Sequence, residues 1–119
     1  MRIRLPSRQS LLAASFLLGP GPAFAAAPQP DAAAGSHISI TCAACHGSDG
    51  ISVDTSIPNL AGQHYVYLVQ QITAFRDRSR ISPLMNELAR PLTDRQIEDI
   101  AAYYASVPIA VGKPSNAKH

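Results

Sequence analysis

Two stretches of the chain carry apolar side chains at the spacing of an amphipathic helix. Residues 63–79 gather Tyr65, Leu68, Val69, Ile72 and Phe75 on one stripe, with polar residues opposite. Residues 94–106 form a second stripe with Ile97, Ile100, Ala101 and Tyr104, and Thr93 with Gln96 makes the capping-box signature of a helix start. Alternating, strand-like patterning is absent from the sequence. The pattern therefore predicts an all-α fold.

The remaining segments are shorter or irregular. One short helix is predicted from about Ala32 to Cys45, with Ile38 on its apolar side and Gly35 at a point where another element approaches closely. Residues 47–62 are rich in Gly, Ser, Asp and Pro and predict a long loop, which in a small domain usually serves a function. Pro83 is taken to end the helical region before it, so residues 80–91, including Met85, are expected to be irregular.

The first 25 residues have the pattern of a secretory signal peptide. Arg2, Arg4 and Arg8 form a basic start, residues 11–18 an apolar core, and residues 23–25 (Ala-Phe-Ala) a cleavage site. The apolar core is much shorter than the roughly 20 residues that span a bilayer, so a retained anchor is the weaker alternative. We expect a signal peptide at 1–25, a flexible leader at 26–33, one domain at 34–108 and a disordered tail at 109–119.

Removing the signal peptide changes the charge of the chain. The full sequence has a formal charge of +2, but cleavage takes away three arginines and leaves a net charge of −1. The basic balance of the full chain therefore predicts neither nucleic-acid binding nor a stable membrane span. A single domain of this size buries a modest part of its surface and often depends on a staple, metal or cofactor.

Cys42-Ala43-Ala44-Cys45-His46 has the C-x-x-C-H pattern of c-type haem attachment. Two thiols three positions apart can bond to the two vinyl groups of one haem, and the adjacent histidine can bind its iron. Three other interpretations compete. A redox disulfide needs a βαβ context, a structural zinc site needs four ligands, and a bridge so short stabilises little. The motif therefore favours one covalently bound haem c, with Cys42 and Cys45 as thioethers and His46 as an iron ligand.

Met85 is the one methionine left after signal-peptide cleavage, and it is a candidate for the second axial ligand. By composition alone, a methionine is more often core filler than a ligand. The rivals are His37, His64 and His119. His119 is terminal, His37 is close to the attachment motif, and His64 starts a helix on its polar side.

The motif TCAACHGSDG, the segment IPNLAGQHYVYLVQQITAFRDRSR, the stretch around Met85 and the segment LTDRQIEDIAAYYAS follow one another along the chain. In content and order they resemble the bacterial class I cytochromes c, most closely one haem domain of the cytochrome c-four kind. The likeness covers residues 34–107. It implies a small fold of three to four main helices wrapped around one haem.

The resemblance also implies roles for single residues. It places the axial methionine at Met85, and the carbonyl of Pro58, twelve residues after His46, as acceptor of a hydrogen bond from the iron-bound imidazole. It implies that Gly35 and Ile38 of the first helix cross Ile100 and Tyr104 of the last. The role that the resemblance implies for these four crossing residues is structural and not redox. The arginines at 76, 78 and 80 remain open between pairing with a haem propionate and forming a solvated surface.

With both axial positions filled, we expect a periplasmic electron-transfer protein and not an enzyme, because no iron site is free for a substrate. Its partners would be redox proteins met through weak contacts, with no nucleic acid and no small-molecule substrate. Two alternatives stay open: a haem-bearing subunit of a larger periplasmic dehydrogenase, and a haem sensor or enzyme with a labile sixth ligand.

Overall fold

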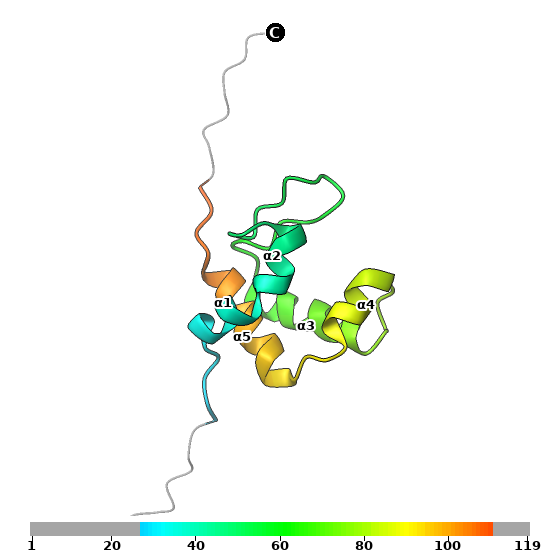
Figure 1. The fold of residues 1–119 in the computed structure, drawn as a ribbon. Coiled ribbons are helices and arrows are strands. Elements are labelled where there is room, and N and C mark those ends of the chain that lie inside the picture. The colour runs from blue at the N-terminus through cyan, green and yellow to red at the C-terminus, as the bar shows by residue number, and fades with distance from the viewer. Residues whose placement is uncertain (1–26, 111–119) are drawn as a thin grey trace, which may run out of the picture.

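The computed structural model describes residues 27–110, and within them it contains five helices and no strand. The helices are α1 (Ala32–Ile38), α2 (Ile40–His46), α3 (Tyr65–Arg76), α4 (Pro83–Ala89) and α5 (Asp94–Ser106) (Figure 1). The all-α prediction is confirmed. The predicted signal peptide and most of the predicted tail lie outside the described residues.

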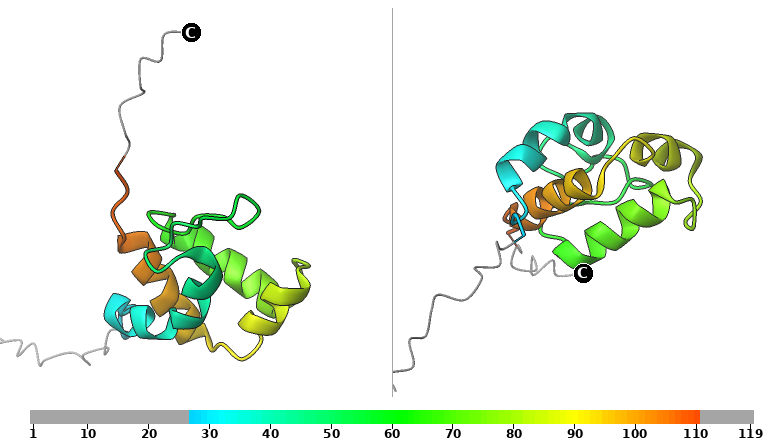
Figure 2. Two further views of the ribbon diagram at one scale, coloured as in Figure 1. Left: turned by 45° about the horizontal axis from the view of Figure 1, so that its top comes forward. Right: turned by 90° about the horizontal axis from the view of Figure 1, so that it is seen from below.

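Helix α1 crosses α5 at Gly35, as the sequence predicted (Figure 2). A Cβ at Gly35 would lie 1.9 Å from the carbonyl oxygen of Asp99, so only glycine permits this approach. The buried carboxylate of Asp99 accepts a hydrogen bond of 2.7 Å from the N–H of Asp31, the residue that caps α1. One residue of α5 therefore fixes both the start of α1 and its point of closest contact.

The single helix predicted from Ala32 to Cys45 is two helices. The chain turns at Ser39, which ends α1 and precedes α2, and its φ of −70° and ψ of −3° stay near helical values. No proline or glycine marks this break. The apolar pattern runs across it, which is why the sequence did not reveal it.

The prediction that residues 80–91 are irregular is wrong, because α4 occupies Pro83–Ala89. Pro83 stands in the first turn of α4, where its missing N–H costs no hydrogen bond. A proline read as the end of one helix thus begins the next, and Met85 lies on a helix instead of a loop.

Helix α5 begins and ends where the sequence predicted. Thr93 accepts a hydrogen bond from the N–H of Gln96, and the side chain of Gln96 accepts one from the N–H of Thr93, which completes the capping box. The hydrophobic core of the described region is small and centres on α5 and one residue of α3; its members are Leu68, Ile100, Ala101 and Tyr104.

The helix contacts leave a gap between α2 and α4. Helix α3 packs against α4 and α5, whereas the backbone of α2 lies close to α1 and to no other described helix. Side chains of α2, α3 and α4 therefore face a common space that the small core does not fill. This space is the candidate functional site.

Candidate functional site

The space between α2, α3 and α4 is a cavity of about 440 Å³. Its walls are mainly apolar, with Leu68, Ile72 and Phe75 from α3 and Met85 and Leu88 from α4. A volume of this size and an apolar lining are typical of pockets that hold a cofactor. The apolar stripe predicted for residues 63–79 therefore serves both the cavity and the core. Leu68, Ile72 and Phe75 line the cavity, whereas Tyr65 and Val69 pack against the core and do not line it.

Helix α2 brings Cys42, Cys45 and His46 to one side of the cavity. Residues three and four positions apart share a helix face, so the C-x-x-C-H spacing and the helix agree. Both cysteines are free thiols; Cys42 is half-buried and Cys45 is exposed. Burial raises the pKa of the Cys42 thiol, which keeps it neutral beside the apolar wall.

His46 is buried, with 8% of its surface exposed, and its Nδ1 lies 2.8 Å from the carbonyl oxygen of Pro58. A carbonyl oxygen only accepts, so Nδ1 carries the proton and donates it. In the neutral imidazole the other ring nitrogen, Nε2, then has the lone pair that can bind a metal. The contact that the resemblance implied is therefore present in the structure.

Met85 lines the cavity from α4 and is half-buried. The rivals within the described residues, His37 and His64, are exposed and do not line the cavity. His119 lies outside the described residues. Because Met85 is on a helix and not on the expected irregular segment, the direction of its side chain is set by how α4 is held.

Asn86 holds α4 in place, and sequence analysis missed it. Its side chain is buried; Nδ2 donates to the carbonyl oxygens of Phe75 (2.6 Å) and Arg80 (2.8 Å), and Oδ1 accepts from the N–H of Ser82 (2.9 Å). These bonds close the turn that joins α3 to α4. The available signal was an amide beside Met85 in the segment PLMNELA, whose other polar residue is Glu87.

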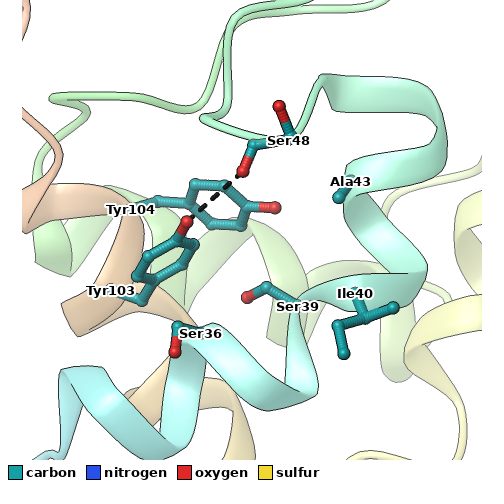
Figure 3. A pocket seen from close by; sticks show the side chains of 7 residues that line it. All are labelled: Ser36, Ser39, Ile40, Ala43, Ser48, Tyr103 and Tyr104. Atoms are coloured by element: carbon teal, nitrogen blue, oxygen red, sulfur yellow. Dashed lines mark hydrogen bonds between the residues drawn. The ribbon is translucent and has the colours of Figure 1, made fainter.

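A smaller cavity of about 200 Å³ lies on another side of α2 (Figure 3). Tyr104 lines both cavities, and its buried hydroxyl has no hydrogen-bond partner in the described region. Beside it, Tyr103 donates a hydrogen bond of 3.4 Å to the carbonyl oxygen of Ser48. Burial raises the pKa of Tyr104 to about 12, so this ring stays neutral at physiological pH.

The residues around the larger cavity fit a covalently bound haem. Two free thiols on one helix face, a histidine whose Nδ1 is bonded to a backbone carbonyl, and a thioether all border the same apolar space. The described residues do not provide what a redox disulfide or a zinc site would need. Residues 27–110 contain no strand for a βαβ redox site, and no cluster of three or more His, Cys, Asp or Glu side chains for a zinc ion.

Comparison with known proteins agrees with this geometry. The model of the family described as "Cytochrome c" matches residues 32–108. Cytochrome c-554(548) of Halomonas halodenitrificans is 48% identical over 79 residues, which cover 64% of this chain and 95% of that protein. The thiosulfate dehydrogenase electron acceptor of Stutzerimonas stutzeri is 34% identical over 110 residues, which cover 81% of this chain and 51% of that protein.

Among solved structures, reduced cytochrome c4 from Pseudomonas stutzeri superposes with a TM-score of 0.65 at 38% identity. The match covers 70% of this chain and 48% of that one. The chain thus spans nearly all of the Halomonas protein but about half, or less, of the other relatives named above and of several further ones.

Proposed function

Because this chain belongs to the cytochrome c family and so carries covalently bound haem c, we propose that it is a one-electron carrier with a six-coordinate haem. In this proposal Cys42 and Cys45 form the thioethers, and His46 and Met85 are the axial ligands. One observation carries it: the backbones of α2 and α4 do not come close, yet Cys42, Cys45 and His46 of α2 and Met85 of α4 line the same cavity.

Each residue has a distinct task in this proposal. The haem iron, when bound, supplies the reversible one-electron change between the ferrous and ferric states. Pro58 holds His46 in the tautomer that can bind iron, and the Met85 thioether favours the reduced state. The apolar walls limit access of water. Since both axial positions are filled, no position is free for a substrate, and the protein is not an enzyme.

We further propose that the protein works in the periplasm, where the sequence of residues 1–25 would direct it. Those residues lie outside the described part of the chain. Within the described part, no helix is long and apolar enough to cross a membrane.

The partners in this proposal are other redox proteins, met through weak, short-lived contacts. A second candidate is an electron-transfer subunit of a larger dehydrogenase. It is favoured by the similarity to the cytochrome subunit of sulfide dehydrogenase of Chlorobaculum tepidum, which is 34% identical over 88 residues that cover 73% of this chain and 79% of that protein. A sensor or enzyme with a labile sixth ligand is the third and weakest alternative.

The test is expression of the full chain in a bacterium that attaches haem in the periplasm, followed by mass spectrometry and a redox titration. We expect haem that stays bound after denaturation and titrates reversibly as a single one-electron couple. The Cys42→Ala/Cys45→Ala double variant should release its haem on denaturation, whereas Ala43→Ser/Ala44→Ser should not. Extractable haem in the wild type would overturn the proposal. Purification of the native protein in a stable complex with a catalytic subunit would select the second candidate.

A further inference from the structure

Arg80 differs from the other arginines in the part of the chain that the structure describes. Each of the other four forms an ion pair with a carboxylate. The pairs are Arg76 with Asp77 and Asp94, Arg78 and Arg90 with Glu87, and Arg95 with Asp99. Arg80 has no carboxylate partner among the described residues, so its charge is unmatched.

Arg80 is also the one residue with a formal charge among those that line the larger cavity. Its Nη1 donates a hydrogen bond of 2.5 Å to Oε1 of Gln71, which lines the same cavity. Its guanidinium carbon stands 4.5 Å from the centre of the Phe75 ring, where a cation is attracted to the aromatic face. These contacts hold the guanidinium at an otherwise neutral wall.

The backbone of Arg80 is fixed more firmly than its exposure suggests. Its N–H donates to the carbonyl oxygen of Ala74 at 3.0 Å, and its own carbonyl oxygen accepts from Asn86 at 2.8 Å. The side chain is exposed, so it stands at the rim of the cavity, where solvent and apolar wall meet. One nitrogen is used by Gln71, and the remaining N–H groups of the guanidinium are available.

The edge of a haem carries two propionate carboxylates, and the rest of its ring is largely apolar. At an apolar cavity these charged groups need water or a charged partner, because burying an unpaired carboxylate costs free energy. A guanidinium offers a planar fork of N–H donors that matches a carboxylate. We propose that Arg80, positioned by Gln71 and Phe75, binds a propionate of the haem. This inference rests on the proposed function, because it takes the larger cavity as the haem site.

Such a contact changes the redox properties of the protein. A carboxylate near the iron stabilises the ferric state, which carries the extra positive charge, and a paired guanidinium offsets that effect. Removing the guanidinium should therefore lower the reduction potential. Arg78 is the matched control, since it is equally a surface arginine of the same turn but pairs with Glu87 and does not line the cavity.

The test compares haem-loaded wild type with Arg80→Gln, Arg80→Lys and Arg78→Gln by potentiometric titration. The same proteins, carrying haem labelled with ¹³C in the propionates, are measured by redox-induced infrared difference spectroscopy. We expect a lower potential in Arg80→Gln, a smaller decrease in Arg80→Lys and little change in Arg78→Gln. The labelled carboxylate band should shift in Arg80→Gln and keep its wild-type position in Arg78→Gln.

Equal shifts of the potential in Arg80→Gln and Arg78→Gln, with an unmoved carboxylate band, would overturn the inference and make Arg80 a solvated surface residue. The proposed function would survive that result if haem attachment and the axial-ligand spectrum were intact. If Arg80→Gln does not fold, the infrared spectrum of the labelled wild type decides whether the propionate is paired with a guanidinium. A labelled band at the position of a free, water-exposed carboxylate contradicts the contact, and one displaced as in a guanidinium pair supports it.

Discussion

The imidazole of His46 and the backbone carbonyl of Pro58 are joined by a hydrogen bond of 2.8 Å across twelve residues of chain. The bond ties α2 to the long loop that follows it and leaves Nε2 of the ring without this partner. Proline fixes its own φ near −65°, which limits the conformations of the chain at the carbonyl that accepts this hydrogen bond.

Replacing Pro58 by alanine should loosen this carbonyl and weaken the proposed bond of His46 to the haem iron. Loss of such a supporting contact typically costs ten- to a hundredfold in metal affinity. In an acid titration of the ferric protein, a tenfold loss would raise the pH at which a proton displaces His46 by about one unit. The control is Pro83→Ala, which alters a proline at the start of α4 and leaves the bond between His46 and Pro58 in place. An unchanged acid midpoint in Pro58→Ala would show that the loop alone positions the carbonyl.

Replacing Gly35 by alanine should strongly destabilise the fold. The new Cβ would meet the backbone oxygen of Asp99 at 1.9 Å, and backbone cannot rotate away as a side chain can. Helices α1 and α5 must therefore separate, at an expected cost of about 3 kcal/mol or more in the free energy of unfolding. Urea denaturation followed by circular dichroism measures this cost. Ala33→Ser, at an exposed position of α1, should cost well under half as much, and similar costs for both would refute the packing account.

Replacing Asn86 by alanine should destabilise the turn between α3 and α4. The change leaves three backbone groups, from Phe75, Arg80 and Ser82, without their partner, and we expect a loss of about 2–4 kcal/mol. Because α4 carries Met85, the proposed axial ligand, added imidazole should also replace its thioether at a lower concentration than in wild type. Asn59→Ala is the control, since Asn59 is exposed and accepts one bond, from the N–H of Ser52. If Asn86→Ala is as sensitive to imidazole as the wild type, the turn between α3 and α4 does not determine how firmly Met85 is held.

The elements that the sequence predicted well are those with a local physical signal. The capping box of Thr93 and Gln96 fixed the start of α5, and the small size of Gly35 indicated a close helix crossing. The C-x-x-C-H motif likewise needs only its own spacing to bring its side chains to one face of α2.

The missed features depend on contacts between distant residues. Pro83 suits a helix start as well as a helix end, and the hydrogen bonds of Asn86 to the preceding turn decide between them. Ser39 breaks a continuous apolar pattern without any residue that signals a break. An apolar stripe also reads the same whether it faces a core or a cofactor cavity, so the structure was needed to show that Leu68, Ile72 and Phe75 line the cavity and Tyr65 does not.

Tyr104 predicts a loss of stability in alkaline solution. Its folded-state pKa is raised to about 12 by burial, against an ordinary value of 10, so the folded protein holds this proton more tightly than the unfolded chain does. The stabilisation is complete below about pH 10 and is lost as pH rises toward about 12, with a decrease of up to about 2–3 kcal/mol. Urea denaturation at a series of pH values measures it.

Tyr104→Phe should remove this part of the alkaline decrease and, at neutral pH, should cost little, because the hydroxyl it deletes is buried without a partner. Tyr103→Phe is the control, since the Tyr103 hydroxyl is bonded to Ser48 and half-exposed. If the free energy of unfolding of Tyr104→Phe falls in alkaline solution as much as that of the wild type, a group other than Tyr104 causes the decrease.

The central claim, that His46 and Met85 fill both axial positions of the iron, is tested most directly by the ferric absorption spectrum of the wild type, Met85→Ala and Leu84→Ala. Leu84 is the neighbouring exposed residue of α4 and lines the same cavity, so its replacement controls for local disturbance. The account predicts a low-spin ferric spectrum with a methionine–iron charge-transfer band in the wild type and in Leu84→Ala. Met85→Ala should lose the band and show a lower reduction potential. A high-spin ferric wild type, or a band that persists in Met85→Ala, would contradict the account.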